Sequence, residues 1–197
     1  AWKKELLTTA ARIAADSREE GFSVCACYGT LLAAVREGVL IGHDNDVDMM
    51  FVSAANTMLQ AVEDFHRFQT FLEAKGYRVR ELSNGQIYVF SGGYSVDVFL
   101  AWFEDGKLSL TFTVRAGVLE QEILPFGAAT LHGCELPVPR CPEALLEAIY
   151  GPGWKVPDPA FTWQRPAAIE EYFAPIHNYH RGAHADYWRQ YYSARGT

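Results

Sequence analysis

Residues 28–51 read YGTLLAAVREGVLIGHDNDVDMMF and place an aspartate at every second position before a short apolar run. Alternation predicts a strand over 47–52 that is entered from Asp46, with Asp46 and Asp48 on the same face. By the rise of a strand, their Cα atoms lie roughly 6.5 to 7 Å apart. The Met-Met-Phe that follows favours a buried strand over a solvated sheet edge, whereas Asp44 fits a turn equally well. The stretch therefore predicts two carboxylates side by side on a buried strand.

Carboxylates at this spacing can both reach one or two divalent ions. Without a cation, Asp46 and Asp48 would repel each other and raise one another's pKa. Asp97 repeats the pattern in YSVDVFL, residues 94–100, where an acidic side chain is costly to bury unless it is paired. Asp97 alone would fit a partner for Arg or Lys. The combination of the three aspartates is what indicates a metal site.

Upstream of the aspartates, Gly29 and Thr30 open a predicted short helix over 31–36. The first backbone N–H groups of a helix have no partner within it and can bind an anion. A Gly-Thr pair alone is a common turn. Its position before a helix and upstream of the Asp-x-Asp strand makes it a candidate phosphate cradle.

The composition is that of an ordinary globular protein. The chain has 197 residues, 49% of them hydrophobic, which suits one domain with a buried core. The net charge of −7 argues against broad attraction to nucleic acid or to an anionic membrane surface. No apolar run approaches the length of a spanning helix and no signal peptide opens the chain, so a cytoplasmic location is the expectation. The chain begins at Ala1 without Met, which fits an excised or processed protein and leaves room for neighbouring domains of a larger polypeptide.

The cysteines form no Cys-x-x-Cys pair, so we expect buried free thiols rather than disulfides or structural zinc. They are Cys25, Cys27, Cys134 and Cys141.

Hydrophobic periodicity and turn residues predict an α+β order of elements. The expected helices run from Trp2 to a stop by Gly21, from a cap at Ser53 or Asn56 to Gly76, and from Pro142 to Gly151. The other expected strands cover 22–27, 77–82, 86–91, 94–103 and 107–114, with Asn84-Gly85 turning a hairpin. We expect a core over 1–153 and an aromatic, proline-rich tail over 154–197 that wraps around it within a single domain.

The segment GTLLAAVREGVLIGHDNDVDMMF resembles the signature of LicD-type phosphotransferases. That family is related to the fukutin group and lies in the nucleotidyltransferase superfamily, which also includes DNA polymerase β-like enzymes. The superfamily pattern is a Gly-Ser/Thr turn, a spacer, Asp-x-Asp on a strand and a third carboxylate on a later strand. The matching residues, in order, are Gly29 with Thr30, Asp46 with Asp48, and Asp97. The family spacer commonly reads GTLLGAVR and ends in WDDDID, where this chain has Ala33, His43 and Asn45. The resemblance spans roughly 28–154.

The resemblance implies an α+β, DNA polymerase β-like nucleotidyltransferase fold, with a mixed β-sheet flanked by helices. It implies Mg²⁺ or Mn²⁺ held by Asp46, Asp48 and Asp97, with Asp97 completing the metal site or taking the acceptor's proton. The residues that would bind the nucleotide-diphospho donor are Gly29, Thr30, Arg36 and Asp44. An exposed position at the helix end is an equal interpretation of Arg36.

The activity implied is transfer of a phospho-group from a CDP-linked donor to a glycan hydroxyl, with release of CMP. The group would be phosphocholine or an alditol phosphate such as glycerol or ribitol phosphate, and the glycan-assembly machinery would place the protein at the inner face of the membrane. The spacing does not decide which phosphorus is attacked, so a nucleotidyltransferase acting on a small molecule or protein stays open. A non-catalytic nucleotide- or glycan-binding module is the third hypothesis. No nucleic-acid partner is expected.

The tail contains HNYHRGAHADYW, residues 177–188. Its histidines, His177, His180 and His184, fit a structural or surface role better than a metal site. The aromatic residues beside them fit either a platform for an acceptor sugar or packing of the tail.

Overall fold

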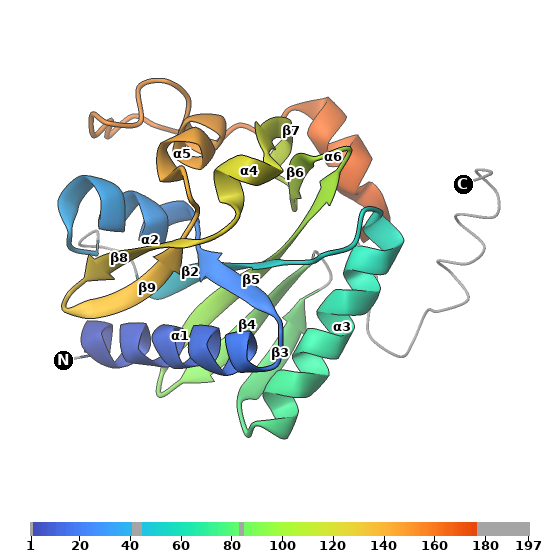
Figure 1. Ribbon diagram of the computed structural model, residues 1–197. Helices are drawn as coiled ribbons and strands as arrows, with labels where there is room; N and C mark the ends of the chain where they lie inside the picture. Colours follow the sequence, from blue (N-terminus) through green and yellow to red (C-terminus); the bar gives the residue numbers. More distant parts are fainter. Residues whose placement is uncertain (1, 41–44, 83–84, 177–197) are drawn as a thin grey trace.

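The computed structural model describes residues 2–40, 45–82 and 85–176, which form a mixed sheet with helices packed on it (Figure 1). The sheet has seven strands in the order β1-β2-β5-β4-β3, and β6 pairs with both β5 and β7. These strands are β1 (Ser23–Ala26), β2 (Asp46–Val52), β3 (Arg78–Leu82), β4 (Gln86–Ser91), β5 (Tyr94–Glu104), β6 (Lys107–Leu110) and β7 (Val114–Leu119). A second, two-stranded sheet pairs β8 (Gly127–Leu131) with β9 (Cys134–Val138). The expected α+β class with a mixed sheet is confirmed.

The helices are α1 (Trp2–Glu19), α2 (Tyr28–Leu32), the π-helical turn η1 (Ala33–Glu37), α3 (Met58–Ala74), α4 (Glu120–Ile123), α5 (Pro142–Tyr150), α6 (Ala167–Phe173) and the 3₁₀ turn η2 (Ala174–Ile176). In Figure 1, α1 and α3 lie across one face of the large sheet. Among the described residues, no helix combines the length and apolar character needed to cross a membrane.

Alternation along β2 divides its side chains between the two faces of the sheet, as the sequence predicts. Phe51 faces α3, where its ring stacks on Phe68 with centroids 4.6 Å apart and tilts against Phe65 at 5.6 Å. Phe22 packs on the same cluster. Because this aromatic core fixes one face of β2, the aspartates must point to the opposite face.

Two helix boundaries differ from the expectation. Neither Ser53 nor Asn56 caps α3, because Thr57 takes that position and its hydroxyl accepts from the backbone N–H of Gln60. The Ser53 hydroxyl donates to the Asp64 carboxylate at 2.5 Å instead. The helix expected over 31–36 begins at Tyr28 and continues as the π-helical turn η1. The residue after η1, Gly38, has the left-handed conformation with φ of 70°.

The strand expected over 107–114 is wrong as a single element. It is two strands, β6 and β7, separated by a turn over 111–113 in which Phe112 has φ of 59°. The hairpin of β8 and β9 and the short helix α4 were not expected, because proline-rich composition obscured the alternation there. The hairpin packs beside α1 and β1 (Figure 1).

The end of the described chain lies against the core. Trp154, Phe173 and Ile176 are buried, and the Phe173 ring contacts Trp102 at 5.7 Å and Phe112 at 5.4 Å between centroids. The division into a core over 1–153 and a tail over 154–197 stays a prediction. All four cysteines are free thiols, of which Cys25 and Cys27 are buried and Cys134 and Cys141 are half-buried.

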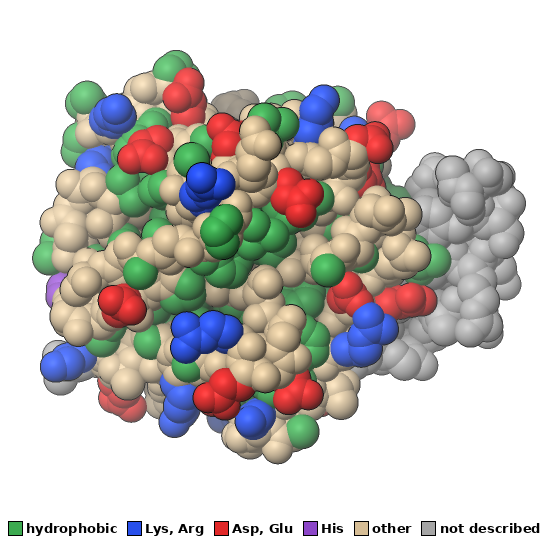
Figure 2. Space-filling view, in the orientation of Figure 1, with side chains coloured by type: hydrophobic (Ala, Val, Ile, Leu, Met, Phe, Trp, Pro, Cys, Tyr) green, Lys and Arg blue, Asp and Glu red, His purple; other side chains and the backbone are tan. Residues whose placement is uncertain are grey.

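Acidic and basic side chains are interspersed on the face shown in Figure 2, which is the face that carries α1 and α3. The aspartates of β2 lie on the other face of the sheet.

Candidate active site

The three aspartates that the sequence singles out meet on two neighbouring parallel strands. The register of β2 and β5 places Asp48 directly opposite Asp97. Carboxylate oxygens of Asp46, Asp48 and Asp97 lie within 4.8 Å of one another. Asp46 and Asp48 are half-buried, and Asp97 is only 6% exposed. The expected convergence of the three carboxylates is therefore present.

Two neutral donors hold the Asp97 carboxylate. Ser95 donates its hydroxyl to Oδ1 at 2.7 Å, and Gln86 donates its amide to Oδ2 at 3.0 Å. Burial raises the pKa of Asp97 from 3.8 to about 6, and the nearby charge of Asp46 adds to the rise, while the two hydrogen bonds oppose it. Asp97 is therefore a fixed carboxylate whose pKa lies close to neutral pH.

Sequence reasoning missed both of these donors. Ser95 lies two residues before Asp97 and therefore on the same face of β5, which is a signal that alternation alone supplies. Gln86 reaches Asp97 from β4, where the antiparallel register pairs Gln86 with Phe99. That contact depends on the hairpin register, so a list of acidic positions could not reveal it.

Asp48 is held by the start of α2. Its Oδ2 accepts from the backbone N–H of Gly29 at 3.1 Å, and its own backbone N–H donates to the Thr30 hydroxyl at 2.8 Å. The Thr30 side chain is buried. Gly29 and Thr30 therefore position the strand carboxylate in this structure, and their predicted contacts with a diphosphate stay predictions.

Tyr28 starts α2 with a strained backbone, because its φ is 43° although it is not glycine. Its hydroxyl lies 2.5 Å from the Thr113 hydroxyl in the turn between β6 and β7, and its ring meets Phe99 edge-on at 4.7 Å. Burial raises the pKa of Tyr28 well above its usual range. These contacts tie the start of α2 to the sheet, a role that the sequence does not indicate.

The remaining predicted site residues are Arg36 and Asp44. The Arg36 guanidinium donates to the Glu37 carboxylate at 2.6 Å and to the Trp154 carbonyl at 3.2 Å, so it links η1 to the chain after α5. Its predicted contact with the donor stays a prediction. Asp44 lies outside the described residues, as do the histidines of the tail, His177, His180 and His184.

A cavity of about 290 Å³ opens directly beside the carboxylates, and Asp48 and Gln86 form part of its wall. Most of the remaining wall is aromatic, from Tyr28, Phe99, Phe112, Tyr150, Phe161 and Trp163, and Arg165 adds one cation. For the residues after Trp154 we expected only a tail that wraps around the core. Tertiary contacts bring residues 161–165 to this cavity.

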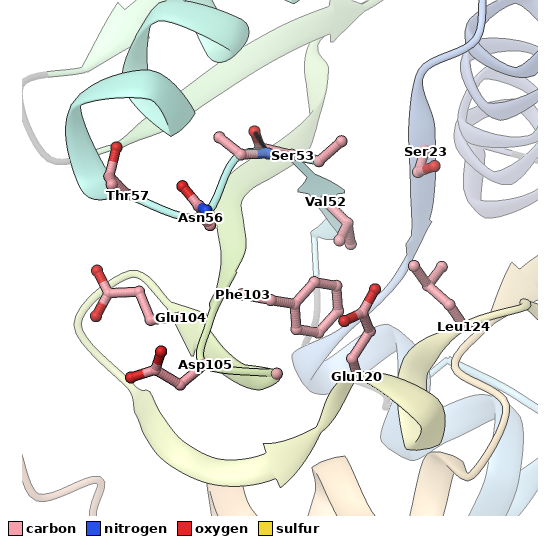
Figure 3. Close-up of a pocket in the computed structure, with 13 residues that line it drawn as sticks. Ser23, Val52, Ser53, Asn56, Thr57, Phe103, Glu104, Asp105, Glu120 and Leu124 are labelled. Carbon is pink, nitrogen blue, oxygen red and sulfur yellow. Dashed lines mark hydrogen bonds between the residues drawn. The ribbon is translucent and has the colours of Figure 1, made fainter.

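A larger cavity, of about 610 Å³, lies at the opposite end of β2 (Figure 3). Figure 3 shows Phe103 between Val52 and Glu120, with Glu104 at the end of β5 and Asp105 on the turn that follows. Asp46 and Val52 are the two ends of β2, so this cavity lies about 20 Å from Asp46 by strand rise. Of the three clustered aspartates, Asp48 lines the smaller cavity and none lines the larger one, so cavity volume alone does not mark the candidate site.

The donor set fits Mg²⁺ or Mn²⁺. Both ions prefer oxygen ligands, and the three carboxylates supply such ligands from two rigid strands. Burial is the main cause of the raised pKa of Asp97, and the negative charge of Asp46 adds to it. The side-chain donors described for Asp97, Ser95 and Gln86, are both neutral. A divalent cation would compensate the negative charge of the cluster.

Residues 21–141 match the LicD/FKTN/FKRP nucleotidyltransferase domain, and this segment covers more than half of the chain. The chain belongs to the LicD/FKTN/FKRP family. Within this family match lie the start of α2, both aspartates of β2 and Asp97 of β5. Membership of the LicD/FKTN/FKRP family and the fold together indicate a transferase.

Solved structures confirm the nucleotidyltransferase fold. A crystal structure of ANT(2'')-Ia in complex with adenylyl-2''-tobramycin has a TM-score of 0.51 and 19% identity, covering 85% of this chain and 85% of that chain. A solution structure of the antibiotic-resistance factor ANT(2'')-Ia has a TM-score of 0.51 and 18% identity, over 85% of this chain and 80% of that chain. At such identity the likeness to this LicD/FKTN/FKRP chain shows the fold alone. A comparison with curated protein sequences found no match.

Proposed function

We propose that this chain is a metal-dependent phosphotransferase that moves a phospho-group from a CDP-linked donor to a glycan hydroxyl and releases CMP. The transferred group is phosphocholine or an alditol phosphate such as glycerol or ribitol phosphate. The observation that carries the proposal is the convergence of Asp46, Asp48 and Asp97 within 4.8 Å at the edge of an aromatic cavity. Family membership supports the donor and acceptor classes.

Asp46 and Asp48 would hold Mg²⁺ or Mn²⁺, and the Asp97 carboxylate lies close enough to complete the same site. When bound, the ion supplies neutralisation of the donor's diphosphate charge. The protein supplies position: Gly29 and Thr30 fix Asp48, and Ser95 and Gln86 fix Asp97. Held in this way, the carboxylates need little reorganisation during reaction.

The transfer step involves one bond formed and one broken at phosphorus. The oxygen of the acceptor hydroxyl attacks the phosphorus distal to cytidine, and the bond between that phosphorus and the bridging oxygen breaks. The bonding electron pair leaves with CMP. Asp97 accepts the proton of the acceptor hydroxyl, a role consistent with a carboxyl whose pKa is raised to about 6.

The direct test is mass spectrometry of products after incubation with a panel of CDP-linked donors, a pooled glycan acceptor and Mg²⁺ or Mn²⁺. The expected result is CMP together with an acceptor that has gained the donor's phospho-group. Asp46→Asn should abolish it. Asp105→Asn is a matched control, because Asp105 is exposed on the turn at the opposite end of the sheet. Turnover that is unchanged by Asp46→Asn or by metal removal would refute the proposal.

Nucleotidyl transfer is the second candidate, and the ANT(2'')-Ia complex with adenylyl-2''-tobramycin is the observation that favours it. In that reaction the acceptor would gain a nucleotide monophosphate, because the α-phosphorus is attacked. The same mass spectra separate the two reactions. An acceptor carrying the nucleotide itself would select nucleotidyl transfer, and an acceptor carrying only the head-group phosphate would exclude it.

A further inference from the structure

One wall of the cavity beside the carboxylates comes from outside the family-matched segment 21–141. Phe161, Trp163 and Arg165 occupy every second position of a segment without regular secondary structure, and all three line the cavity. We call residues 161–165 the aromatic strap. Asp48 lines the same cavity, so the aromatic strap and a candidate metal ligand contribute to a single binding space.

Contacts on both sides hold the aromatic strap in place. The Phe161 ring meets Tyr150 of α5 edge-on at 5.6 Å. At the other end, the Arg165 guanidinium lies 5.3 Å from the centre of the Phe112 ring and pairs with Glu170 of α6 at 3.1 Å. The strap is therefore anchored to α5, to the turn between β6 and β7, and to α6.

Although anchored, two of its rings keep a large exposed surface. Phe161 is 44% exposed and Trp163 is 39% exposed. Arg165 lies 5.0 Å from the Trp163 ring centre, in addition to its contact with Phe112. Large aromatic side chains left open at the mouth of a cavity offer faces on which a planar ring can stack.

The chemistry of the cavity favours a nucleoside over an oligosaccharide. Its volume of about 290 Å³ lies just below the usual range of small-ligand sites, which begins at about 300 Å³. The walls are mostly aromatic, and their polar side chains Gln86, Thr111 and Thr113 are already hydrogen-bonded within the protein, so ring faces are the main surface offered to a ligand. Arg165 pairs with Glu170 and lies against the rings of Phe112 and Trp163, so it supports the aromatic wall of the cavity.

From this arrangement we infer that the aromatic strap binds the nucleobase of the donor, with the base stacked on Trp163 and the phosphates directed toward Asp48. This inference rests on the proposed use of a nucleotide-linked donor. It adds that nucleotide affinity is set by residues 161–165, which the family match does not include. Trp163 is the residue on which the stacking depends most.

The test is calorimetric titration of the full chain with CMP, UMP, AMP and GMP, each in the presence of Mg²⁺. Stacking of a base on an aromatic side chain is worth about 1–3 kcal/mol, so Trp163→Ala should weaken nucleotide binding by roughly fivefold to a hundredfold. Trp163→Phe keeps a stacking face and should stay within about threefold of the parent protein. Val156→Ala is the control, because Val156 belongs to the same stretch of chain, is 72% exposed and does not line the cavity. Thermal melting of each variant confirms that it is folded.

The outcomes separate this inference from the proposed function. If folded Trp163→Ala binds every nucleotide as tightly as the parent protein, or if the parent protein binds none of them, the inference is wrong. If Trp163→Ala weakens only the binding of the glycan acceptor, the cavity is an acceptor site and the inference is again wrong. If Trp163→Ala weakens nucleotide binding but the parent protein turns over no CDP-linked donor, the aromatic strap binds the base and the proposed reaction is wrong. If the parent protein turns over a CDP-linked donor and Trp163→Ala leaves the donor KM unchanged, the proposed reaction stands and the strap does not bind the base.

Discussion

Asp48 and Asp97 lie directly opposite each other on the parallel strands β2 and β5, and each is fastened by a different part of the chain. Asp48 is held by Gly29 and Thr30 at the start of α2. Asp97 is held by Ser95 and Gln86. These contacts keep two carboxylates close together without neutralising their negative charge.

Metal binding should stabilise the protein. A ligand that binds only the folded state at a concentration of 100 times its Kd adds about 2.7 kcal/mol to the free energy of unfolding. We therefore expect Mg²⁺ or Mn²⁺ to raise the Tm in a concentration-dependent way, measured by differential scanning calorimetry, and EDTA to reverse the rise. Asp46→Asn should lose most of this response while Asp105→Asn keeps it. An equal metal response in the two variants would show that the ion binds elsewhere.

The metal-free protein should become less stable as the pH rises from about 4 to about 6. The pKa of Asp97 is raised from 3.8 to about 6 on folding, so within this window the folded state holds a proton that the unfolded chain has lost. The free energy of unfolding therefore falls by on the order of 1–2 kcal/mol across the window. Chemical denaturation at a series of pH values gives this slope. Asp97→Asn removes the titrating group and should flatten that part of the profile, and a profile identical to that of the parent protein would contradict the assignment.

Thr30→Val should destabilise the protein and misplace Asp48. The Thr30 hydroxyl is buried and accepts the backbone N–H of Asp48 at 2.8 Å, so the substitution removes the acceptor of that N–H. Leaving a buried donor without its partner costs about 1–3 kcal/mol, which urea denaturation can resolve. Thr30→Ser retains the hydroxyl and serves as the matched control. If Thr30→Val and Thr30→Ser are equally stable, the hydrogen bond does not hold the strand.

Phe173→Ala should loosen α6 and the aromatic strap that precedes it. Phe173 is fully buried against Trp102 and Phe112, and truncating a buried phenylalanine to alanine costs about 3–5 kcal/mol. Urea denaturation should show that loss, and limited proteolysis should show faster cleavage within residues 154–176. Val156→Ala, at an exposed position, should change neither measurement. Unchanged protection of this stretch in Phe173→Ala would mean that other contacts anchor it.

Local sequence patterns were enough to predict much of the sheet and the acidic cluster. Alternation along β2 sets the face of each side chain within a few residues, so Asp46 and Asp48 could be placed together without knowing any partner strand. An acidic residue within the apolar strand pattern of residues 94–100 indicated Asp97, and the superfamily order of motifs agreed with it. The same local approach joined β6 and β7 into one strand, because nothing in residues 107–114 signals that Phe112 adopts a left-handed backbone.

The sequence by itself determined which side chains could form the site: a turn before a helix, two aspartates on one face of a strand and a third on a later strand. Only the tertiary structure decided what surrounds them. The register of β4 against β5 brings Gln86 to Asp97, and the packing of α6 brings Trp163 and Arg165 to the cavity that Asp48 lines. Hydrophobic periodicity depends on residues close together in the sequence, so it can be recognised there. Strand register, and the path of a segment without regular structure, depend on contacts between residues far apart in the sequence. Those contacts form only when the whole core is packed.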